Sequence, residues 1–490
     1  MTSPLLIGDH PLLESIPVGD RMAGWPESID PATRHCIIAF RQEGENGSAD
    51  DSQALARLKD LAGRHEGSVF VEILVHDPIS VALFENSSLP GIECLPFTVE
   101  TRWAETLFGP GGLVHLDGDG ISYTDNRRLH LVLFGMTAAA EALAVEALKT
   151  AHFPNYIRDH SLRTRITWIS PAAPAFGARF TDRYKSLMDA SFYRFVDLEK
   201  EEVRLHRPDH DGRMEDFVDF EWEFVQAMGL EGAMRAKLKQ WTDPASGWRT
   251  VIAFAGSEDG KNIEYFHSLR NDLGDAPVLV HVSDDSLVKA AGLPVIPFGM
   301  PWGCMRNTSL ERRIGMAVNA VYTLVARDKH VPLELDMGEA ERLWVELPGR
   351  FRRASLDNAK SLGSKMRSIG LQEEDWKVLY GIDSDSADRL AEVEHNRWSV
   401  ATLLSGMRPT TAEEQAAVEK DIALKRTLQE KGVHYDLRAY SDLRVDDMGN
   451  DVRLYDQALT ECLPLIAHAA AAMEENPREG SRARIREAVE

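Results

Sequence analysis

Short apolar runs alternate with amphipathic helical patterns from the N-terminus to about residue 300. HCIIAF at His35–Phe40 and TVIAF at Thr250–Phe254 are typical of buried strands, and each is followed by a polar loop and a helical stretch. Beyond that point the β-branched runs end and helical periodicity takes over. The pattern therefore predicts an α/β region followed by an all-α region, with the boundary near the glycine- and proline-rich Pro297–Arg306.

The α/β region contains an internal repeat. The first copy begins at His35 and closes on the short strand CLPF, and the second begins at Thr250 and closes on VIPF. Within the copies, ILVH ending at His76 matches VLVH ending at His281, and both precede a turn and a helical pattern. This correspondence indicates a duplicated βαβαβ half-domain.

Only the second copy is preceded by further strand patterns. Leu129–Phe134 (LHLVLF) is followed by a glycine turn, an alanine-rich helix and the strands Arg165–Ser170 and Val218–Val225. That order is typical of the first half of a Rossmann domain. The sequence thus predicts Rossmann-like parallel-sheet units, one truncated and one full. A truncated sheet leaves an unpaired edge that a second chain can complete, so we expect a homodimer or higher homo-oligomer.

The chain divides into five predicted segments. They are a truncated Rossmann-like half-domain (1–124), a degenerate Rossmann domain (125–305), a linker helix (306–339), a helical domain (340–470) and a flexible tail (471–490).

The glycine turn of the second unit is incomplete as a dinucleotide fingerprint. Such a fingerprint needs glycines at the turn and at the approach to the pyrophosphate, and an acid at the end of the second strand. The corresponding positions here are Gly135, Thr137 and Ala140, and Ser170 stands at the strand end. The helix N-terminus can still offer N–H groups to a phosphate. Two interpretations stay open, a structural relic and an atypical nucleotide site, and ordinary NAD is disfavoured.

Two later segments add to this picture. SEDGKN contains Asp259 and Asn262, and VLVHVSDDSL contains His281. Together with the strand, glycine and helix at Leu129–Leu148, they resemble the RCK N-terminal (TrkA-N) family of Rossmann domains. The resemblance implies a nucleotide sensor that regulates potassium transport, and it makes Asp259, Asn262 and His281 candidate cofactor-binding residues.

The segment LAEVEHNRWSVATLLSGMRPT at residues 390–410 is the most specific part of the helical region. Glu394 shares an apolar helical face with Trp398, and a lone buried carboxylate is costly, so Glu394 requires a partner. The choices are an ion pair with Arg350 or Arg353 of the preceding helix, or contact with a ligand. Trp398 fits either a core position or the wall of a ligand pocket.

Residues 341–370 carry another helical pattern, with apolar positions recurring on one face and a stop at Gly370. Asn358 belongs to a polar stripe on a different face. Ser355 follows an arginine cluster at a position typical of a helix N-cap. Ser355 is therefore a candidate cap as well as a candidate ligand contact.

The motifs of this region resemble the RyR repeat of ryanodine receptors. The shared features are an Ala-Glu-x-x-His-x-x-Trp helix at 391–398, a Gly-x-Arg turn at 406–408, HYDLRAYSDL at His434–Leu443 and the pair Tyr455-Asp456. The resemblance implies a non-enzymatic ligand-recognition domain, of the kind that joins TrkA-N-like units in bacterial antiphage and regulatory proteins. The ligand-binding residues that it suggests here are Arg350, Arg353, Ser355, Asn358, Glu394, His395, Arg397, Trp398 and Tyr440.

Charge and cysteine content narrow the function classes. With a formal net charge of −23, the surface repels a phosphate backbone, so broad nucleic-acid binding is not expected. The cysteines Cys36, Cys94, Cys304 and Cys462 show no CxxC or CxxH pairing, which argues against a zinc site and a disulfide framework. Neither a signal-peptide pattern nor a bilayer-length apolar run is found, so we expect a cytoplasmic protein.

These features favour a non-enzymatic sensor that binds a nucleotide-derived small molecule through its RyR-like or Rossmann domain, in an antiphage signalling system. The alternative is an RCK-like cytoplasmic regulator whose membrane partner is a potassium channel or transporter. Enzymatic activity is disfavoured because P-loop, GxSxG and HExxH motifs are absent from the sequence. No metal site is predicted, and the cofactor is left as a nucleotide of unknown identity.

Overall fold

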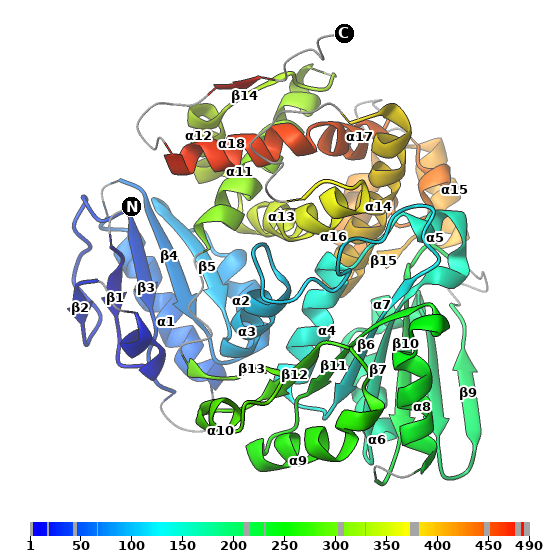
Figure 1. The fold of residues 1–490 in the computed structure, drawn as a ribbon. Helices are drawn as coiled ribbons and strands as arrows, with labels where there is room; N and C mark the ends of the chain where they lie inside the picture. Colours follow the sequence, from blue (N-terminus) through cyan, green and yellow to red (C-terminus); the bar gives the residue numbers. More distant parts are fainter. Residues whose placement is uncertain are drawn as a thin grey trace.

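The computed structural model of the 490-residue chain describes residues 3–16, 19–42, 47–65, 67–208, 216–229, 232–301, 308–328, 330–372, 382–444, 451–475 and 482–484. Figure 1 shows two α/β units, the first in blue and the second in cyan to green, and a helical region in yellow-green to red. Parallel α/β sheets followed by a largely helical region are the fold class that the sequence predicts, and this prediction is confirmed.

The first unit is a parallel five-stranded sheet with the order β2-β1-β3-β4-β5. Its strands are β1 (Leu5–Ile7), β2 (Arg21–Met22), β3 (His35–Ile38), β4 (Val69–Leu74) and β5 (Ile92–Phe97). Its helices are the 3₁₀ helix η1 (Pro11–Ser15), α1 (Gly47–Ala62), α2 (Pro78–Glu85) and α3 (Val99–Phe108). Since side chains alternate along a strand, Ile38 and Ile73 pack with α1 and α2 on one face. Ile37 and Leu74 pack with η1 and α3 on the other.

The two shortest strands occupy the sheet edge that the sequence analysis leaves unpaired. Strands β1 and β2 have three and two residues, too few to give an alternating pattern. β1 pairs with β3 from Leu5↔Cys36 to Ile7↔Ile38. The first unit is the smaller one, as predicted, but the chain's own N-terminal residues cover the β3 edge.

The second unit is an eight-stranded sheet with the order β13-β12-β11-β6-β7-β10-β8-β9, parallel throughout except for the β8–β9 pair. Its strands are β6 (Arg128–Phe134), β7 (Thr164–Ser170), β8 (Phe192–Asp197), β9 (Glu202–His206), β10 (Phe220–Gln226), β11 (Trp248–Phe254), β12 (Val278–His281) and β13 (Ile296–Phe298). Across the sheet, the six strands from β13 to β10 follow one another in the Rossmann order. The β8–β9 hairpin, which the sequence analysis missed, extends the sheet beyond β10.

Helices cover both faces of the second sheet and give it the three layers of a doubly wound fold. One face carries α4 (Ala138–Thr150), α6 (Ala173–Arg183) and α7 (Lys185–Asp189), with the short α5 (Asn155–Arg158) nearby. The other carries α8 (Gly232–Thr242), α9 (Asp259–Leu269) and α10 (Ser286–Ala290). The predicted repeat is present: β3-α1-β4-α2-β5 and β11-α9-β12-α10-β13 share one order, with their strands adjacent in each sheet.

Much of the helical region packs around an apolar core. Its helices are α11 (Ser309–Asp328), α12 (Met337–Glu346), α13 (Gly349–Ser368), α14 (Ser384–Leu404), α15 (Ala412–Lys420), α16 (Leu424–Glu430), α17 (Arg453–Glu461) and α18 (Leu463–Glu475). Short strand pairs join β14 (Glu334–Asp336) to β17 (Arg482–Arg484) and β15 (Arg408–Pro409) to β16 (Val433–His434). Among the described residues, no helix combines the length and the apolar character needed to cross a membrane.

Two segment boundaries differ from the sequence analysis. The segment predicted as a linker helix contains α11, whose Ile314, Val318 and Val321 are buried in the core of the helical region. α13 begins at Gly349 rather than at Ser355, because Pro348 precedes the first turn. It ends at Ser368, before Gly370 with φ +83°. Residues 302–307, which include Cys304, and most of the predicted tail lie outside the described residues.

Candidate functional site

The glycine turn of the second unit lies at the point where the strand order reverses, between β6 and β11. Gly135 adopts φ +108°, and a Cβ at this position would lie 2.7–2.8 Å from backbone atoms of Ala255 and Gly256. The Thr137 hydroxyl donates to the Ala255 carbonyl at 2.6 Å and accepts from the Ala140 N–H at 3.2 Å. These bonds tie the turn to β11 and cap α4, so the hydroxyl is satisfied within the protein.

The other predicted cofactor-binding residues also bond within the chain. Asn262 donates to the carbonyls of Gly256 and His281 and accepts from the Gly256 N–H, each at 2.9 Å. Asp259 accepts from the N–H and hydroxyl of Ser283. Ser170 Oγ accepts from the Ala172 N–H. These contacts fix the loops after β7, β11 and β12, and none of them requires a cofactor.

Helix α3 of the first unit contacts the second unit at the carboxyl ends of β12 and β13. Trp103 donates from Nε1 to the Met300 carbonyl at 3.0 Å, and its ring meets that of His281 edge-on at 5.4 Å. Burial lowers the pKa of His281. His281 therefore acts as part of an aromatic contact between the two units.

In the helical region, Glu394 is fully buried and paired on both sides. Arg397 donates to its two oxygens at 2.7 and 2.9 Å, and Lys365 of α13 donates to Oε2. Burial opposes the charge, but Arg397 and Lys365 hold the pKa of Glu394 down at about 2. The sequence analysis predicts an internal ion pair or a ligand for Glu394. An internal ion pair is present, but its partners are not the predicted arginines.

The two predicted partners lie elsewhere on α13. Arg353 pairs with Glu85 of α2 at 2.6 Å. Arg350 is exposed, with its guanidinium 4.8 Å from the Phe351 ring centroid. The first-turn arginines thus face the first unit and solvent, because Glu394 lies level with the last turns of α13 rather than the first.

Motif residues distant in sequence meet around His395. Its Nδ1 lies 3.6 Å from Asp456 Oδ2, and its ring lies 5.7 Å from Tyr440. Burial opposes protonation of His395, but Asp456 raises its pKa. The Trp398 ring lies 5.5 Å from the His395 ring at a tilt and meets the His434 ring edge-on at 4.8 Å. The structure therefore brings these predicted motif residues together, with His395 and Asp456 buried and Trp398, His434 and Tyr440 half-buried.

Ser355 and Asn358 occupy the middle of α13. Both are buried, Ser355 is not a cap, and Asn358 Nδ2 has no hydrogen-bond partner among the described residues. Glu394, His395 and Arg397 are each 2% exposed or less. A ligand could reach these residues only after the helices move apart.

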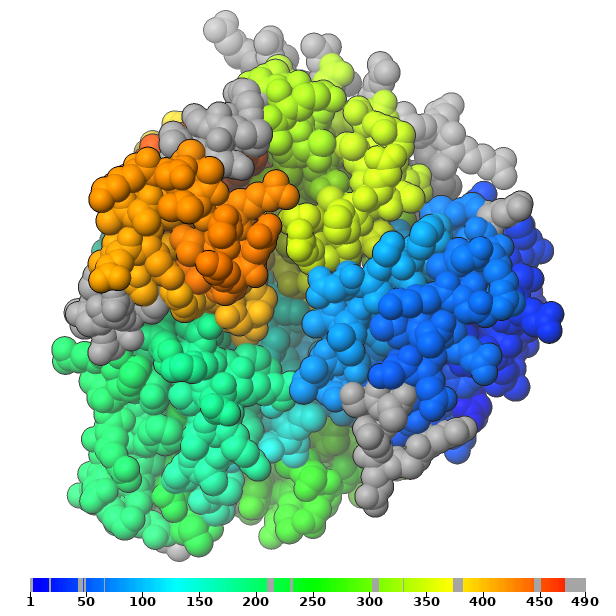
Figure 2. Space-filling model, turned by 180° about the vertical axis from the view of Figure 1, so that it is seen from behind, coloured from blue at the N-terminus to red at the C-terminus, as the bar shows by residue number. Residues whose placement is uncertain are grey.

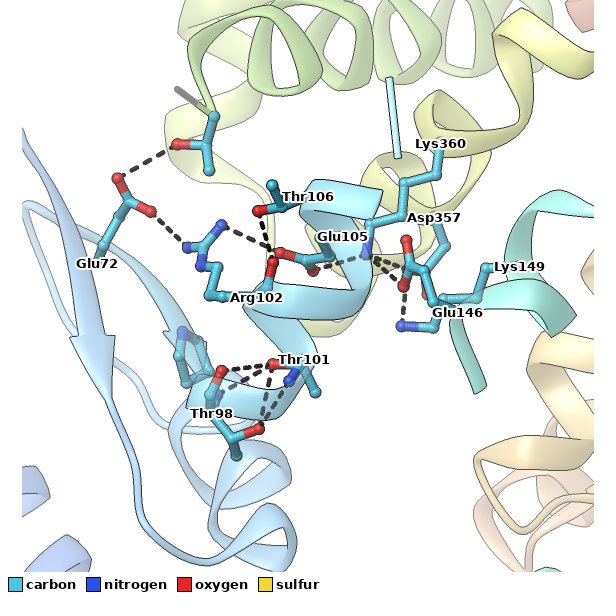
Figure 3. Close-up of polar contacts among 12 residues, drawn as sticks. Glu72, Thr98, Thr101, Arg102, Glu105, Thr106, Glu146, Lys149, Asp357 and Lys360 are labelled. Carbon is cyan, nitrogen blue, oxygen red and sulfur yellow. Dashed lines mark hydrogen bonds and ion pairs between the residues drawn. The ribbon is translucent and has the colours of Figure 1, made fainter. Parts of the chain in front are cut away.

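A chain of buried ion pairs runs through all three parts of the structure (Figure 3). Glu72 on β4 pairs with Arg102 on α3, and Arg102 Nη1 lies 3.2 Å from Glu105 Oε2. Lys360 on α13 reaches both α/β units. Its Nζ lies 2.7 Å from Glu105 Oε1 and 3.2 Å from Glu146 Oε2 on α4. We call these five residues the junction cluster.

The junction cluster is closed to solvent. The side chain of Lys360 is 0% exposed, and those of Glu105 and Glu146 are 7% and 4% exposed. Burial opposes the Lys360 charge, but Glu105 and Glu146 raise the pKa of its ammonium. Burial raises the pKa of Glu146, whose Oε1 has no hydrogen-bond partner among the described residues. Charges buried this deeply are stable only while their partners stay in place, so the cluster couples the positions of the three parts.

Other ion pairs follow the same interfaces. They join Lys149 to Asp357 at 3.3 Å, Arg312 to Glu93 at 2.6 Å and Arg367 to Asp117 at 2.8 Å. From behind, the surfaces of the three parts abut one another (Figure 2). The sequence analysis missed these residues. The sequence feature that could have revealed such ion pairs is the presence of acids, for example Glu105 and Glu146, within apolar helical patterns.

The described residues contain no group of three or more His, Cys, Asp and Glu side chains arranged to hold a metal ion. Cys36, Cys94 and Cys462 are buried free thiols. No protein-family model, curated protein or solved structure matches this chain. The resemblances to the RyR and RCK families therefore rest on the motifs alone.

Proposed function

We propose that this chain is a non-enzymatic sensor in which a nucleotide-derived small molecule changes the arrangement of two α/β units and a RyR-like helical region. The observation that carries the proposal is the junction cluster, in which Lys360 is held by one acid from each α/β unit. A buried ionic junction contributes less stability than apolar packing of the same volume, but it defines one arrangement sharply. Such a junction suits a protein with two discrete arrangements that a ligand can bias.

The RyR-like cluster fits the same proposal. The pairs His395–Asp456 and Lys365–Glu394 join neighbouring helices and leave no group in an obvious catalytic pose. The alternative, a regulator of potassium transport, depends on a nucleotide in the second unit. It is less well supported, because Thr137 and Asn262 already bond the turns that a nucleotide would use.

Two measurements on the full chain test this proposal. Thermal unfolding would be followed with NAD, NADH, ADP-ribose, ATP and cyclic mono- and dinucleotides. A ligand at 100 times its Kd should add about 2.7 kcal/mol to the free energy of unfolding. Hydrogen exchange with the stabilising ligand should then change in α3, α4 and α13 together. Stabilisation with exchange changes confined to one part would contradict the coupling, and no stabilisation by any nucleotide would contradict the sensor.

A further inference from the structure

The strand order of the first sheet places a second topological switch point in the molecule. From β1 the chain passes to β2 on one side, and β3, β4 and β5 follow on the other. In open parallel sheets, ligands bind outside the carboxyl ends of the strands beside such a point. β1 and β3 approach closely here, since a Cβ on Gly8 (φ +122°) would overlap the Ala39 carbonyl.

A cavity of about 240 Å³ opens at this edge, over the carboxyl ends of β3 and β4. Ile38, Ile73 and Leu74 form its floor, and α1 forms one wall. Ligand pockets for drug-sized molecules measure ~300–1,000 Å³. The cavity therefore fits one base with its sugar and phosphate better than a dinucleotide.

The lining supplies both an aromatic surface and cationic groups. Trp25 and Phe40 line the cavity with their rings stacked at 5.2 Å and 18°. Arg41, Arg57 and His76 line it as well. Rings of this kind stack on bases, and guanidinium groups bind phosphate.

Two acidic side chains, Asp50 and Asp51, also line the cavity. Asp51 is occupied, because its oxygens accept from the backbone N–H groups of His76 and Asp77 at 2.9 Å. Asp50 lines the cavity beside it.

We propose that this cavity binds a nucleoside monophosphate, with the base against the Trp25–Phe40 pair and the phosphate at Arg57 and Arg41. The inference rests on the proposed function and assigns its ligand site to the first unit. The second unit has the same kind of switch point, but there the Thr137 hydroxyl is bonded to the Ala255 carbonyl.

The test is calorimetric titration of the full chain with AMP, GMP, CMP and UMP, and with the matching nucleosides. Trp25→Ala should weaken the tightest nucleotide about tenfold or more. Arg57→Gln should weaken the nucleotide by a similar factor but leave the nucleoside within twofold, since only the phosphate contacts Arg57. Lys59→Gln is the matched control, because Lys59 is an exposed cation of the same helix that does not line the cavity.

The outcomes separate this inference from the proposed function. If a nucleotide binds and neither Trp25→Ala nor Arg57→Gln changes its affinity, the site assignment is wrong and the sensor proposal stands. If Arg57→Gln weakens nucleotide and nucleoside equally, the phosphate is not at Arg57. If none of the four monophosphates binds, this inference fails, and the sensor proposal is decided separately by the thermal-unfolding panel of dinucleotides, ADP-ribose, ATP and cyclic nucleotides. Because Arg57 is exposed, its variant should fold normally, which thermal unfolding would verify.

Discussion

Lys360 Nζ lies 2.7 Å from Glu105 Oε1, although 255 positions separate the two residues in the sequence. Lys360 enters from α13 and Glu105 from α3, so one ion pair fixes the helical region against the first unit. The same ammonium also holds Glu146 of the second unit at 3.2 Å. A single side chain thus connects all three parts of the chain.

Replacing Lys360 by methionine should lower the free energy of unfolding by about 3–5 kcal/mol, because two buried carboxylates would each lose an ion-pair partner. Urea unfolding at pH 7 measures this loss. Lys289→Met is the matched control, since Lys289 forms an ion pair with Asp285 while 70% exposed. Its expected effect is under about 1 kcal/mol. Equal losses in the two variants would mean that burial of the junction cluster has no energetic consequence.

Glu394→Gln should destabilise the protein most at neutral pH. The pKa of Glu394 is about 2 in the folded state against a usual 4.5, so its charge stabilises the fold above about pH 4.5 and this contribution is lost as the pH falls toward 2. Urea unfolding at pH 7 and pH 4 should therefore show the gap between wild type and variant narrowing by about 1 kcal/mol.

The control for this experiment is Glu258→Gln, because Glu258 is 61% exposed in its pair with Lys261. It should show no measurable loss. A gap between wild type and Glu394→Gln that stays constant from pH 7 to pH 4 would contradict the low pKa of Glu394.

His434→Gln should flatten the acid side of the stability profile. Burial lowers the pKa of His434 from its usual 6.5 to about 4, so the unfolded state binds the proton more readily and wild type loses stability between about pH 6.5 and pH 4. His395, with its raised pKa, has the opposite dependence, so the difference between wild type and variant isolates His434. Between pH 7 and pH 5 that difference should change by about 1–2 kcal/mol. Parallel profiles would show that His434 titrates normally.

Gly135→Ala should destabilise the second unit by about 2–3 kcal/mol, because alanine is strained at φ +108° and its Cβ would meet the Ala255 backbone. Gly260→Ala is the control, since Gly260 lies in α9 with nothing near its Cβ position. That change should be neutral or stabilise by up to about 1 kcal/mol. Thermal unfolding compares the two. A tolerated Gly135→Ala would remove the packing explanation of the turn and return it to consideration as a ligand site.

The fold class and the Rossmann half of the second unit are predictable because strands such as Leu129–Phe134 are long apolar runs. β1 and β2 are not predictable, since three and two residues carry no periodicity and only pairing with β3 makes them strands. β9 is not predictable for another reason. Its residues are almost all exposed, so its sequence shows no alternation of buried and exposed positions.

For the candidate site, helical spacing shows that Glu394 lies on an apolar face and therefore needs a partner. It does not show which residue of a neighbouring helix lies opposite, and the partner is Lys365 rather than Arg353. The junction cluster is still harder to predict. It depends on how three separately folded surfaces meet, which local sequence does not encode.

The ion pairs of α13 also determine how this chain can be divided into fragments or combined with parts of other proteins. Lys360, Arg353 and Arg367 find their acids, Glu105, Glu85 and Asp117, outside the helical region. A fragment carrying α13 alone would bear a cationic, half-apolar surface, and a chimera with a foreign N-terminal half would bury unmatched cations. The helical region is therefore not portable by itself: exchange between proteins succeeds only when the acids of both α/β units are transferred with it.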